Sequence, residues 1–516
     1  MSNTKIIAKN TGWYGLENIV SALIGIITSI AIARTLGPTR MAYIIYVIWV
    51  ASVVASLGSL GIPSTTQKYM AEFIGRGDRG TARHIYFSTM RLQLALASVA
   101  TTGIVVWVMG NAGAGYKLAS ALVALSILPS MINAVAAQAN VAAEDLSRNL
   151  PASVISIVAF FIAILLVVIF KWGVIGVGAS ILLTRLVDCL VRLVPTTRWI
   201  ASWDKAHQHP EGLSRRMATF AWQSVIGMLL AMVVWDRSEF FLLKHLCSDI
   251  RQVAYYSVAF SMAERLLIAA QVFGSSTGAT IFAQYGRDRS RLPAIAAATF
   301  RYLAMGSIPL HLIAMPLAFP FLMVLYGSQY KGAAMVVMLA PLLCLPKAFI
   351  GPVLSLLQSN ELQRYEIAAT VIAGAVDIGV ACWLIPAHGA VGACVGSGAA
   401  QITAVGLMWA IGIRVYRVKL PWVLITKVMV ASAAASASAY FWIRMLSPVV
   451  AILVGGVSAV AVLLVLFYLL RVLEPEDRSR FHVLIGMLPV TLARPMEKVV
   501  SALIRGGVSD ATPSNV

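Results

Sequence analysis

Apolar residues run along this chain in long segments that short polar connections separate. A helix that crosses the hydrocarbon core of a bilayer needs about 20 mainly apolar residues. The pattern therefore predicts an all-α integral membrane protein with about fourteen transmembrane helices. The predicted spans cover residues 13–33, 42–62, 86–110, 118–141, 150–170, 174–196, 217–243, 252–275, 295–326, 333–358, 365–386, 390–413, 422–444 and 448–470.

Short motifs recur in the same order at offsets of 210 to 216 residues, which predicts that the first twelve spans are one six-span unit used twice. The recurring residues include Ala42 and Ala254, Tyr116 and Tyr330, Arg148 and Arg364, and Gly173 and Gly389. Because six is an even number, both copies enter the membrane from the same side and form parallel repeats. Such halves pack as two lobes around a central path, and rocking between them gives alternating access. A duplicated structural bundle without a transport role is the alternative.

The repeat divides the chain into an N-lobe at residues 1–205 with spans 1–6 and a C-lobe at 206–418 with spans 7–12. Spans 13 and 14 lie at 419–471 and have no counterpart in either half, so we expect them to flank one lobe beside its lateral opening. The segment "SAAASASAY" (Ser432–Tyr440) offers small residues for close helix packing. Residues 472–516 form a polar tail that we expect in the cytoplasm.

Composition and charge favour a membrane protein over a nucleic-acid-binding one. Of the 516 residues, 59% are hydrophobic and 12% are charged, and the net charge is +19. Soluble domains carry roughly a quarter charged residues. Lysines and arginines gather in the connections on one side of the predicted spans, such as Arg76, Arg79 and Arg83. The positive-inside rule makes this side cytoplasmic, which places both termini and the 197–216 loop in the cytoplasm.

The sequence gives little sign of an enzyme or a metal site. Its five cysteines are scattered without a CxxC or Cys/His spacing, so we expect no metal ligation and no disulfide. No GxxxxGK[ST] or HExxH segment occurs, and the connections on the outer side are short. We therefore predict no catalysis and no cofactor, with coupling to H⁺ or Na⁺ left open.

Ionisable side chains inside the predicted spans are the candidates for a functional site, because hydrocarbon is a poor solvent for ions. The segment "MVVWDRSEFFLL" (Met232–Leu243) places Asp236, Arg237 and Glu239 close together in the seventh span. Asp236 lies roughly 28 Å along this span, in the outer part of the bilayer. Asp236 and Glu239 share a helix face, and Arg237 is turned away from it. The cluster either lines a hydrated cavity or is structural at the outer interface.

Other ionisable groups lie at comparable depth. Arg185 and Asp188 are three residues apart and predict a structural ion pair, with ion coupling by Asp188 as the alternative. Lys347 lies beside Pro346 with no acidic residue within one turn, which favours a cavity role. The predicted substrate-binding residues are Arg237, Asp236, Glu239, Arg265, Glu264, Lys347 and Arg34. The ion-coupling candidates are Asp377, Glu17 and Asp188.

Four segments, taken in order, resemble the polysaccharide transporters, the oligosaccharidyl-lipid flippase branch of the multidrug/oligosaccharidyl-lipid/polysaccharide (MOP) exporter superfamily. They are "NTGWYGLENIVSALIGIITSIAIARTLGPTRMAYIIYV" (Asn10–Val47), "GIPSTTQKYMAEFIGRGD" (Gly61–Asp78), "WDRSEFFLLKHLCSDIRQVAYYSVA" (Trp235–Ala259) and "LYGSQYKGAAMVV" (Leu325–Val337). The likeness covers essentially the first 415 residues. Ala42 and Ala254 depart from it, since the family's turn often ends in Gly at these places.

The resemblance implies two six-helix lobes and two further helices, which in some relatives help to accommodate a lipid tail. It implies transport of an undecaprenyl-diphosphate-linked oligosaccharide to the outer leaflet of a bacterial inner membrane, for surface polysaccharide biosynthesis. The implied partners are membrane lipids, the polyprenyl-diphosphate-linked glycan, a polysaccharide polymerase and a chain-length protein. Arg or Lys in a cavity of low dielectric would bind the diphosphate through charge-assisted hydrogen bonds.

Two other classes stay open. A multidrug exporter of the same superfamily would favour an acidic cavity for cationic drugs, and twelve spans are usually enough for it. A membrane-bound polymerase or ligase would be an enzyme and would need a large outer loop with Arg and His. The basic candidates Arg237, Arg265 and Lys347 argue against the exporter, and the short outer loops argue against the enzyme.

Overall fold

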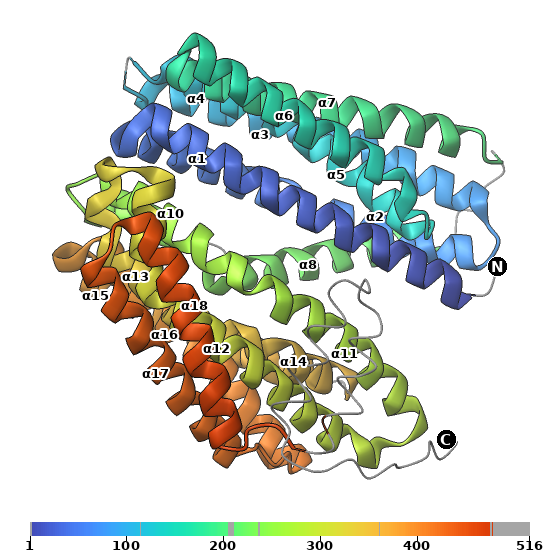
Figure 1. Cartoon of the computed structure of the whole chain (residues 1–516). Coiled ribbons are helices and arrows are strands. Elements are labelled where there is room, and N and C mark those ends of the chain that lie inside the picture. Colours follow the sequence, from blue (N-terminus) through green and yellow to red (C-terminus); the bar gives the residue numbers. More distant parts are fainter. Residues whose placement is uncertain are drawn as a thin grey trace. The chain divides into compact units, whose positions relative to one another are not determined.

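The protein is helical throughout the part of the chain that the structure describes (Figure 1). This computed structural model describes residues 3–113, 115–204, 211–235, 238–360, 362–474 and 477. These residues contain α-helices and short 3₁₀ helices and no strand. The prediction of an all-α fold is confirmed.

The chain forms two compact units, each assembled from more than one segment. Unit 1 comprises Met1–Ser257, Tyr326–Gly332 and Gly374–Ser397, and unit 2 comprises Val258–Leu325, Ala333–Ala373 and Gly398–Val516. The lobes predicted at 1–205 and 206–418 describe a repeat in the sequence, and they stay a prediction.

Unit 1 contains the helices of the first half of the chain. They are α1 (Asn3–Gly58), α2 (Ile62–Gly75), α3 (Arg79–Asn111), α4 (Lys117–Leu125), α5 (Ile127–Ala142), η1 (Leu146–Arg148), α6 (Leu150–Phe170), α7 (Gly173–Ala201), α8 (Leu213–Trp235) and α9 (Glu239–Leu246). A buried cluster joins α2, α3, α5 and the end of α7, and includes Phe73, Tyr86, Val135 and Ile200.

Two glycines with positive φ set the turns near the start of unit 1. Gly37 has a φ of 70° and separates two helical stretches within α1, which takes in the span predicted at 13–33 and most of the span predicted at 42–62. Gly61 also has a φ of 70°, and a Cβ atom there would lie 2.5 Å from the Ala221 carbonyl oxygen of α8. A larger residue at Gly61 would be strained by its backbone angle and would also clash with α8.

The second half of the chain begins with α10 (Arg251–Leu266), whose first residues belong to unit 1. The helices that follow are α11 (Ile268–Arg287), η2 (Arg289–Arg291), α12 (Leu292–Tyr326), η3 (Ser328–Ala333), α13 (Ala334–Cys344), η4 (Leu345–Phe349), α14 (Ile350–Ser359), α15 (Gln363–His388), α16 (Ala390–Tyr416), α17 (Trp422–Met445) and α18 (Pro448–Leu469). The last residues of α15 and the first residues of α16 lie in unit 1, and the remainder of both helices lies in unit 2.

Eleven helices in the described residues are long and apolar enough to cross a membrane, or up to twelve if α10 and the start of α11 form one bent span. The count of fourteen is therefore not confirmed. Two predicted spans are merged in α1. The span predicted at 217–243 is divided between α8 and α9, with residues 236 and 237 outside the description.

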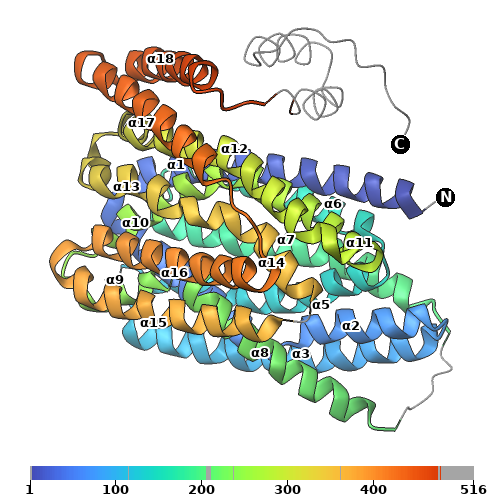
Figure 2. The ribbon, with the colours of Figure 1, turned by 90° about the horizontal axis from the view of Figure 1, so that it is seen from below.

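The last two helices, α17 and α18, pack against each other within unit 2 (Figure 2). Ala435 and Ala439 of α17 and Ala459 of α18 are buried together with Leu317 of α12. The Ser438 hydroxyl donates a hydrogen bond of 3.1 Å to the Ser458 hydroxyl across the helix pair. Small residues thus allow close helix approach here, as the segment Ser432–Tyr440 predicts.

Candidate functional site

Two buried carboxylates of unit 1, Glu239 and Asp377, lie close enough to interact electrostatically. Glu239 begins α9 and is 2% exposed, whereas Asp377 lies in α15 and is 1% exposed. The Ser238 hydroxyl donates a hydrogen bond of 3.3 Å to Asp377 Oδ2. Asp377 Oδ1 is buried and has no hydrogen-bond partner among the described residues. Glu239 and Asp377 thus form a buried acidic pair in the described part of unit 1.

Aromatic rings and hydroxyl groups surround this acidic pair. Tyr256 of α10 is 1% exposed and lies close enough to both carboxylates and to Ser397 of α16 to interact with them electrostatically. The Phe240 ring lies 5.5 Å from the Tyr256 ring and 6.5 Å from the Trp49 ring of α1, measured between centroids. Because two buried carboxylates repel each other when both are charged, a proton or a small cation stabilises such a pair.

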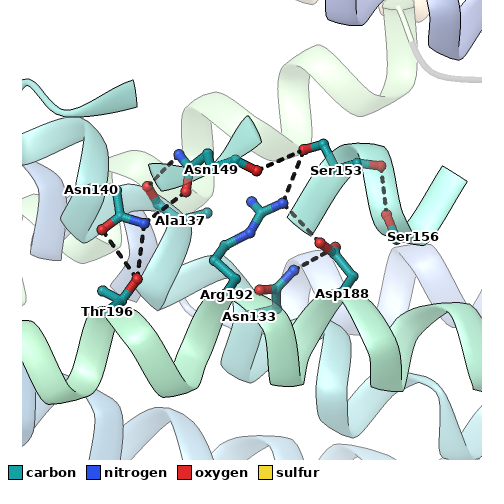
Figure 3. A network of polar contacts seen from close by, with 9 residues as sticks. All are labelled: Asn133, Ala137, Asn140, Asn149, Ser153, Ser156, Asp188, Arg192 and Thr196. Carbon is teal, nitrogen blue, oxygen red and sulfur yellow. Dashed lines mark hydrogen bonds and ion pairs between the residues drawn. The ribbon is translucent and has the colours of Figure 1, made fainter. Parts of the chain in front are cut away.

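A second buried charge cluster of unit 1 lies on α7 (Figure 3). Arg192 Nη2 donates hydrogen bonds of 2.8 Å to Asp188 Oδ1 and 3.2 Å to Ser153 Oγ of α6. Asn133 Nδ2 of α5 donates a hydrogen bond of 2.6 Å to Asp188 Oδ2. The predicted pairing of Asp188 with Arg185 is therefore wrong. The side chain of Arg185 is exposed, and the i,i+4 spacing brings Arg192 to Asp188 instead.

Polar contacts continue from this ion pair along α5 (Figure 3). Asn140 Nδ2 donates hydrogen bonds of 2.8 Å to Asn149 Oδ1 and 3.0 Å to Thr196 Oγ1 of α7. Asn149 Nδ2 in turn donates to the Ala137 carbonyl oxygen at 3.2 Å. The network joins α5, α6 and α7 in the interior of unit 1. Since Arg192 already neutralises Asp188, this geometry suits a structural role, and ion coupling by Asp188 stays a prediction.

In unit 2, Glu264 of α10 and Lys347 of η4 form an ion pair with 3.9 Å between Oε1 and Nζ. The side chain of Lys347 is 15% exposed and that of Glu264 is 36% exposed. Both residues were predicted to line a cavity, and the structure places them together. The neighbouring Arg265 is exposed.

The other predicted residues lie apart from these clusters or outside the description. Asp236 and Arg237 fall outside the described residues, so their contacts with Glu239 stay a prediction. Glu17 lies in α1, and its side chain is also outside the description. Arg34 lies in α1 and is exposed.

Three residues of these clusters, Tyr256, Ser397 and Arg192, are not among the candidates selected from the sequence. Tyr256 and Ser397 carry no charge and resemble ordinary residues of a polar helix face. The pairing of Glu239 with Asp377 joins positions far apart in the chain, and only a folded structure can show it. Arg192 was visible as a basic residue one turn after Asp188, and the i,i+4 rule would have found it.

Two further patterns in the chain bear on metal binding and on catalysis. Within the described residues, no group of three or more His, Cys, Asp or Glu side chains could hold a metal ion. The stretch Gly274–Gly278 has the spacing of a GxSxG nucleophile elbow, but it lies inside helix α11 and not at a strand-to-helix turn.

Comparison with known proteins identifies a family and a fold. Residues 7–282 match the family described as polysaccharide biosynthesis protein. No curated protein sequence matches the chain. Several solved structures are similar in fold although their sequences are distant.

The structure of the lipid II flippase MurJ in an inward closed conformation has a TM-score of 0.69 and 12% identity, over 87% of this chain and 97% of that one. An inward-facing multidrug resistance MATE family transporter of the MOP superfamily has a TM-score of 0.65 and 15% sequence identity. This match covers 77% of this chain and 94% of that one. A MOP superfamily transporter from Pyrococcus furiosus has a TM-score of 0.56 and 13% sequence identity, and it is described as having a binding pocket of reverse polarity. This match covers 80% of this chain and 96% of that one. The chain thus has the fold of the MOP transporters.

Proposed function

The chain belongs to the polysaccharide biosynthesis protein family, and from this membership we propose that it translocates a lipid-linked oligosaccharide across a bacterial inner membrane. The substrate is of the undecaprenyl-diphosphate type, and translocation proceeds by alternating access of the two lobes to the two leaflets. The observation that carries the proposal is the family match on a chain whose fold is shared with a lipid II flippase and with MATE transporters. The protein spans the membrane many times, with both termini in the cytoplasm.

The charged residues within the helices support an anionic substrate. Arg237 and Lys347 are the groups with the chemistry to bind the diphosphate, and Asp236 and Glu239 orient Arg237 when substrate is absent. Polar walls suit the sugar hydroxyls, and the lipid tail stays in the bilayer beside the last two helices. A polysaccharide polymerase and a chain-length protein would receive the glycan on the outer side.

The buried pair of Glu239 and Asp377 supports coupling to H⁺ or Na⁺. Binding of either cation removes the repulsion between the two carboxylates, and its release restores that repulsion. A transport cycle can use this difference if the cation is exchanged on opposite sides of the membrane. The cation is thus a driving ligand and not a resident cofactor.

Export of a cationic drug is the second candidate function. The acidic pair and the fold shared with MATE transporters favour it, since buried carboxylates attract cations. Family membership and the basic residues Arg237 and Lys347 favour the glycolipid. A drug exporter would lower the accumulation of a cationic dye in cells, and a glycolipid flippase would leave this accumulation unchanged.

Substitution of Arg237 tests the proposal in cells. In a strain that lacks this gene, the wild-type chain should restore surface polysaccharide, and Arg237→Lys should restore much less at equal expression. A lysine is a point charge that cannot reproduce the bidentate geometry of a guanidinium on phosphate. If the strain that lacks the gene still exports its surface polysaccharide normally, the proposed function is wrong. If Arg237→Ala restores export as well as the wild type, the cluster at 236–239 is structural.

A further inference from the structure

Unit 1 contains a pocket of about 510 Å³ between the connection from α2 to α3 and the end of α7. Pockets that hold small ligands have volumes of roughly 300 to 1,000 Å³. Two indole rings, one guanidinium, two carboxylates and one hydroxyl line this pocket, on Trp199, Trp203, Arg79, Asp78, Asp204 and Ser202. The pocket is separate from the buried charge clusters of unit 1 described above, and its size and lining suit a small polar ligand.

The two indole rings of the pocket are held in place by their own packing. Trp203 is 8% exposed and belongs to the buried cluster that joins α2, α3, α5 and the end of α7, and Trp199 packs against this cluster. The two ring centroids are 5.0 Å apart, and the rings meet at 82°. The Arg148 guanidinium lies 3.8 Å from the Trp199 centroid and is itself paired with Asp145 at 2.7 Å. Side chains fixed in this way lose little conformational entropy when a ligand binds.

Arg79 supplies hydrogen-bond donors to the pocket. It is the first residue of α3, its side chain is exposed, and it forms no ion pair among the described residues. Its guanidinium lies 5.9 Å from the Trp203 centroid and carries five N–H donors in a fixed plane. Asp78, in contrast, caps α3, where it accepts hydrogen bonds of 2.9 Å from the Thr81 amide and 2.6 Å from the Thr81 hydroxyl. The pocket thus presents a cationic donor group next to an aromatic wall.

The charges of the lining disfavour ions of either sign. Asp78 and Asp204 oppose an anion, and Arg79 opposes a metal ion or an ammonium group, because like charges placed together are destabilising. A neutral ligand with many hydroxyl groups avoids both penalties, and each hydroxyl can donate and accept hydrogen bonds. The C–H face of a sugar ring is apolar and packs against an indole. The lining therefore has the chemistry of a saccharide site.

The position of the pocket also suits a saccharide. It lies beside the connection that carries Arg76 and Arg79, at the end of the helices that the positive-inside rule assigns to the cytoplasm. In the proposed function, the glycan of the lipid-linked substrate is on this side of the membrane before translocation. A saccharide site at this end can therefore contact the glycan before the lipid crosses.

We propose that this pocket binds sugar residues of the substrate glycan in the cytoplasm, with Arg79 as donor and Trp199 and Trp203 as the apolar wall, so that the chain selects its glycan before translocation. The inference rests on the proposed function, because it names the place where the glycan of that substrate is first recognised. The pocket recognises the sugar, and recognition of the diphosphate is left to the basic residues within the helices.

Binding to the purified full-length chain in lipid nanodiscs tests the proposal. The probe is the free oligosaccharide that mild acid releases from the lipid-linked pool of cells lacking this gene, and ligand-observed NMR follows the titration. Ser202→Phe places a large ring at an exposed position of the pocket lining and should weaken binding at least tenfold. Ala201→Phe places the same ring at the exposed neighbouring position outside the lining and should leave the affinity unchanged.

A second pair of variants tests the donor. Arg79→Gln should weaken oligosaccharide binding about tenfold, since hydrogen bonds of charged groups are the strong ones. Arg76→Gln removes the same charge from the same connection, where Arg76 is paired with Glu72 at 2.6 Å, and should leave the affinity unchanged. The affinity for inorganic pyrophosphate should be equal in Arg79→Gln and the wild type.

Three results would overturn the proposal. They are a wild-type chain that does not bind the oligosaccharide, an oligosaccharide affinity that is unchanged in Ser202→Phe or in Arg79→Gln, and a pyrophosphate affinity that falls in Arg79→Gln. The last result would make the pocket an anion site. Each of them leaves the proposed function standing if the wild type flips its lipid substrate in liposomes, and a wild type that does not flip it contradicts the proposed function itself.

Discussion

Buried carboxylates in a membrane protein require a charge partner or a proton, and Glu239 and Asp377 illustrate this requirement. An isolated ion buried in a medium of low dielectric is strongly destabilised. The two side chains are 2% and 1% exposed, and they approach each other across α9 and α15. Their proximity makes this pair the place in unit 1 where a proposed coupling cation or proton would have its largest effect on stability.

Thermal unfolding tests the proposal that this site binds a cation. A ligand that binds only the native state at a hundredfold excess over its Kd stabilises that state by about 2.7 kcal/mol. We expect the wild-type Tm to rise when NaCl replaces choline chloride, or to rise as pH falls if the ligand is H⁺. Asp377→Asn should lose this dependence while it keeps the hydroxyl contact of Ser238. A wild-type Tm that responds to neither Na⁺ nor pH would refute cation binding at the pair.

The ion pair of Asp188 with Arg192 allows a sharper test, because the chain offers a matched control. Removal of one partner of a buried pair costs roughly 3 kcal/mol or more, since the remaining charge is left uncompensated. Arg192→Gln should therefore lower the Tm clearly. The double variant Asp188→Asn/Arg192→Gln should recover part of the loss. Arg185→Gln, at the exposed position three residues before Asp188, should have little effect. A larger loss in Arg185→Gln than in Arg192→Gln would contradict this pairing.

At the scale of elements, small residues let α17 and α18 pack against each other and against α12. Ala439 is fully buried between the helices, and Gly455 faces Leu317. Overpacking of such a contact typically costs 1–3 kcal/mol, taken as about 2 kcal/mol here. We expect Ala439→Leu to lower the Tm, whereas Ala437→Leu on the exposed face of α17 should not. Equal Tm values for the two variants would mean that this contact does not hold the last two helices in place.

Hydropathy predicts the helical segments well, because every helix that crosses a bilayer needs a long apolar stretch, whichever apolar residues form it. It does not find the breaks within them. The interruptions at Leu267 and η4 lie inside apolar windows, and only Pro346 hints at the second. The break at Gly37, in contrast, falls within the connection predicted between the spans at 13–33 and 42–62.

For the site residues, the sequence identifies the charged positions but not the contacts between them. Glu239, Glu264, Lys347 and Asp377 could be selected from the sequence, because a charge inside an apolar segment is rare. Which of them pair could not be predicted, since contacts between distant helices depend on packing that one sequence does not display. The pairing of Asp188 was misassigned because i,i+3 and i,i+4 neighbours compete on one helix face, and burial decides between them.

At the scale of the whole molecule, the central claim is that this MOP-fold chain moves a lipid-linked oligosaccharide between leaflets. The claim joins family membership with charged residues that suit both a diphosphate and a coupling cation. It predicts translocation by the purified protein without any other protein component. It also predicts that a cation gradient alters the rate, through the acidic pair in unit 1.

A leaflet-protection measurement tests this claim most directly. Purified protein is reconstituted into liposomes that contain a fluorophore-tagged undecaprenyl-diphosphate oligosaccharide, and dithionite is added outside to quench exposed fluorophores. Protein-free liposomes should keep their inner-leaflet fluorescence. Liposomes with the wild-type chain should lose nearly all fluorescence, and those with Arg237→Ala should behave like the protein-free control. If liposomes with the wild-type chain keep their inner-leaflet fluorescence under both Na⁺ and H⁺ gradients, the chain does not flip this class of lipid.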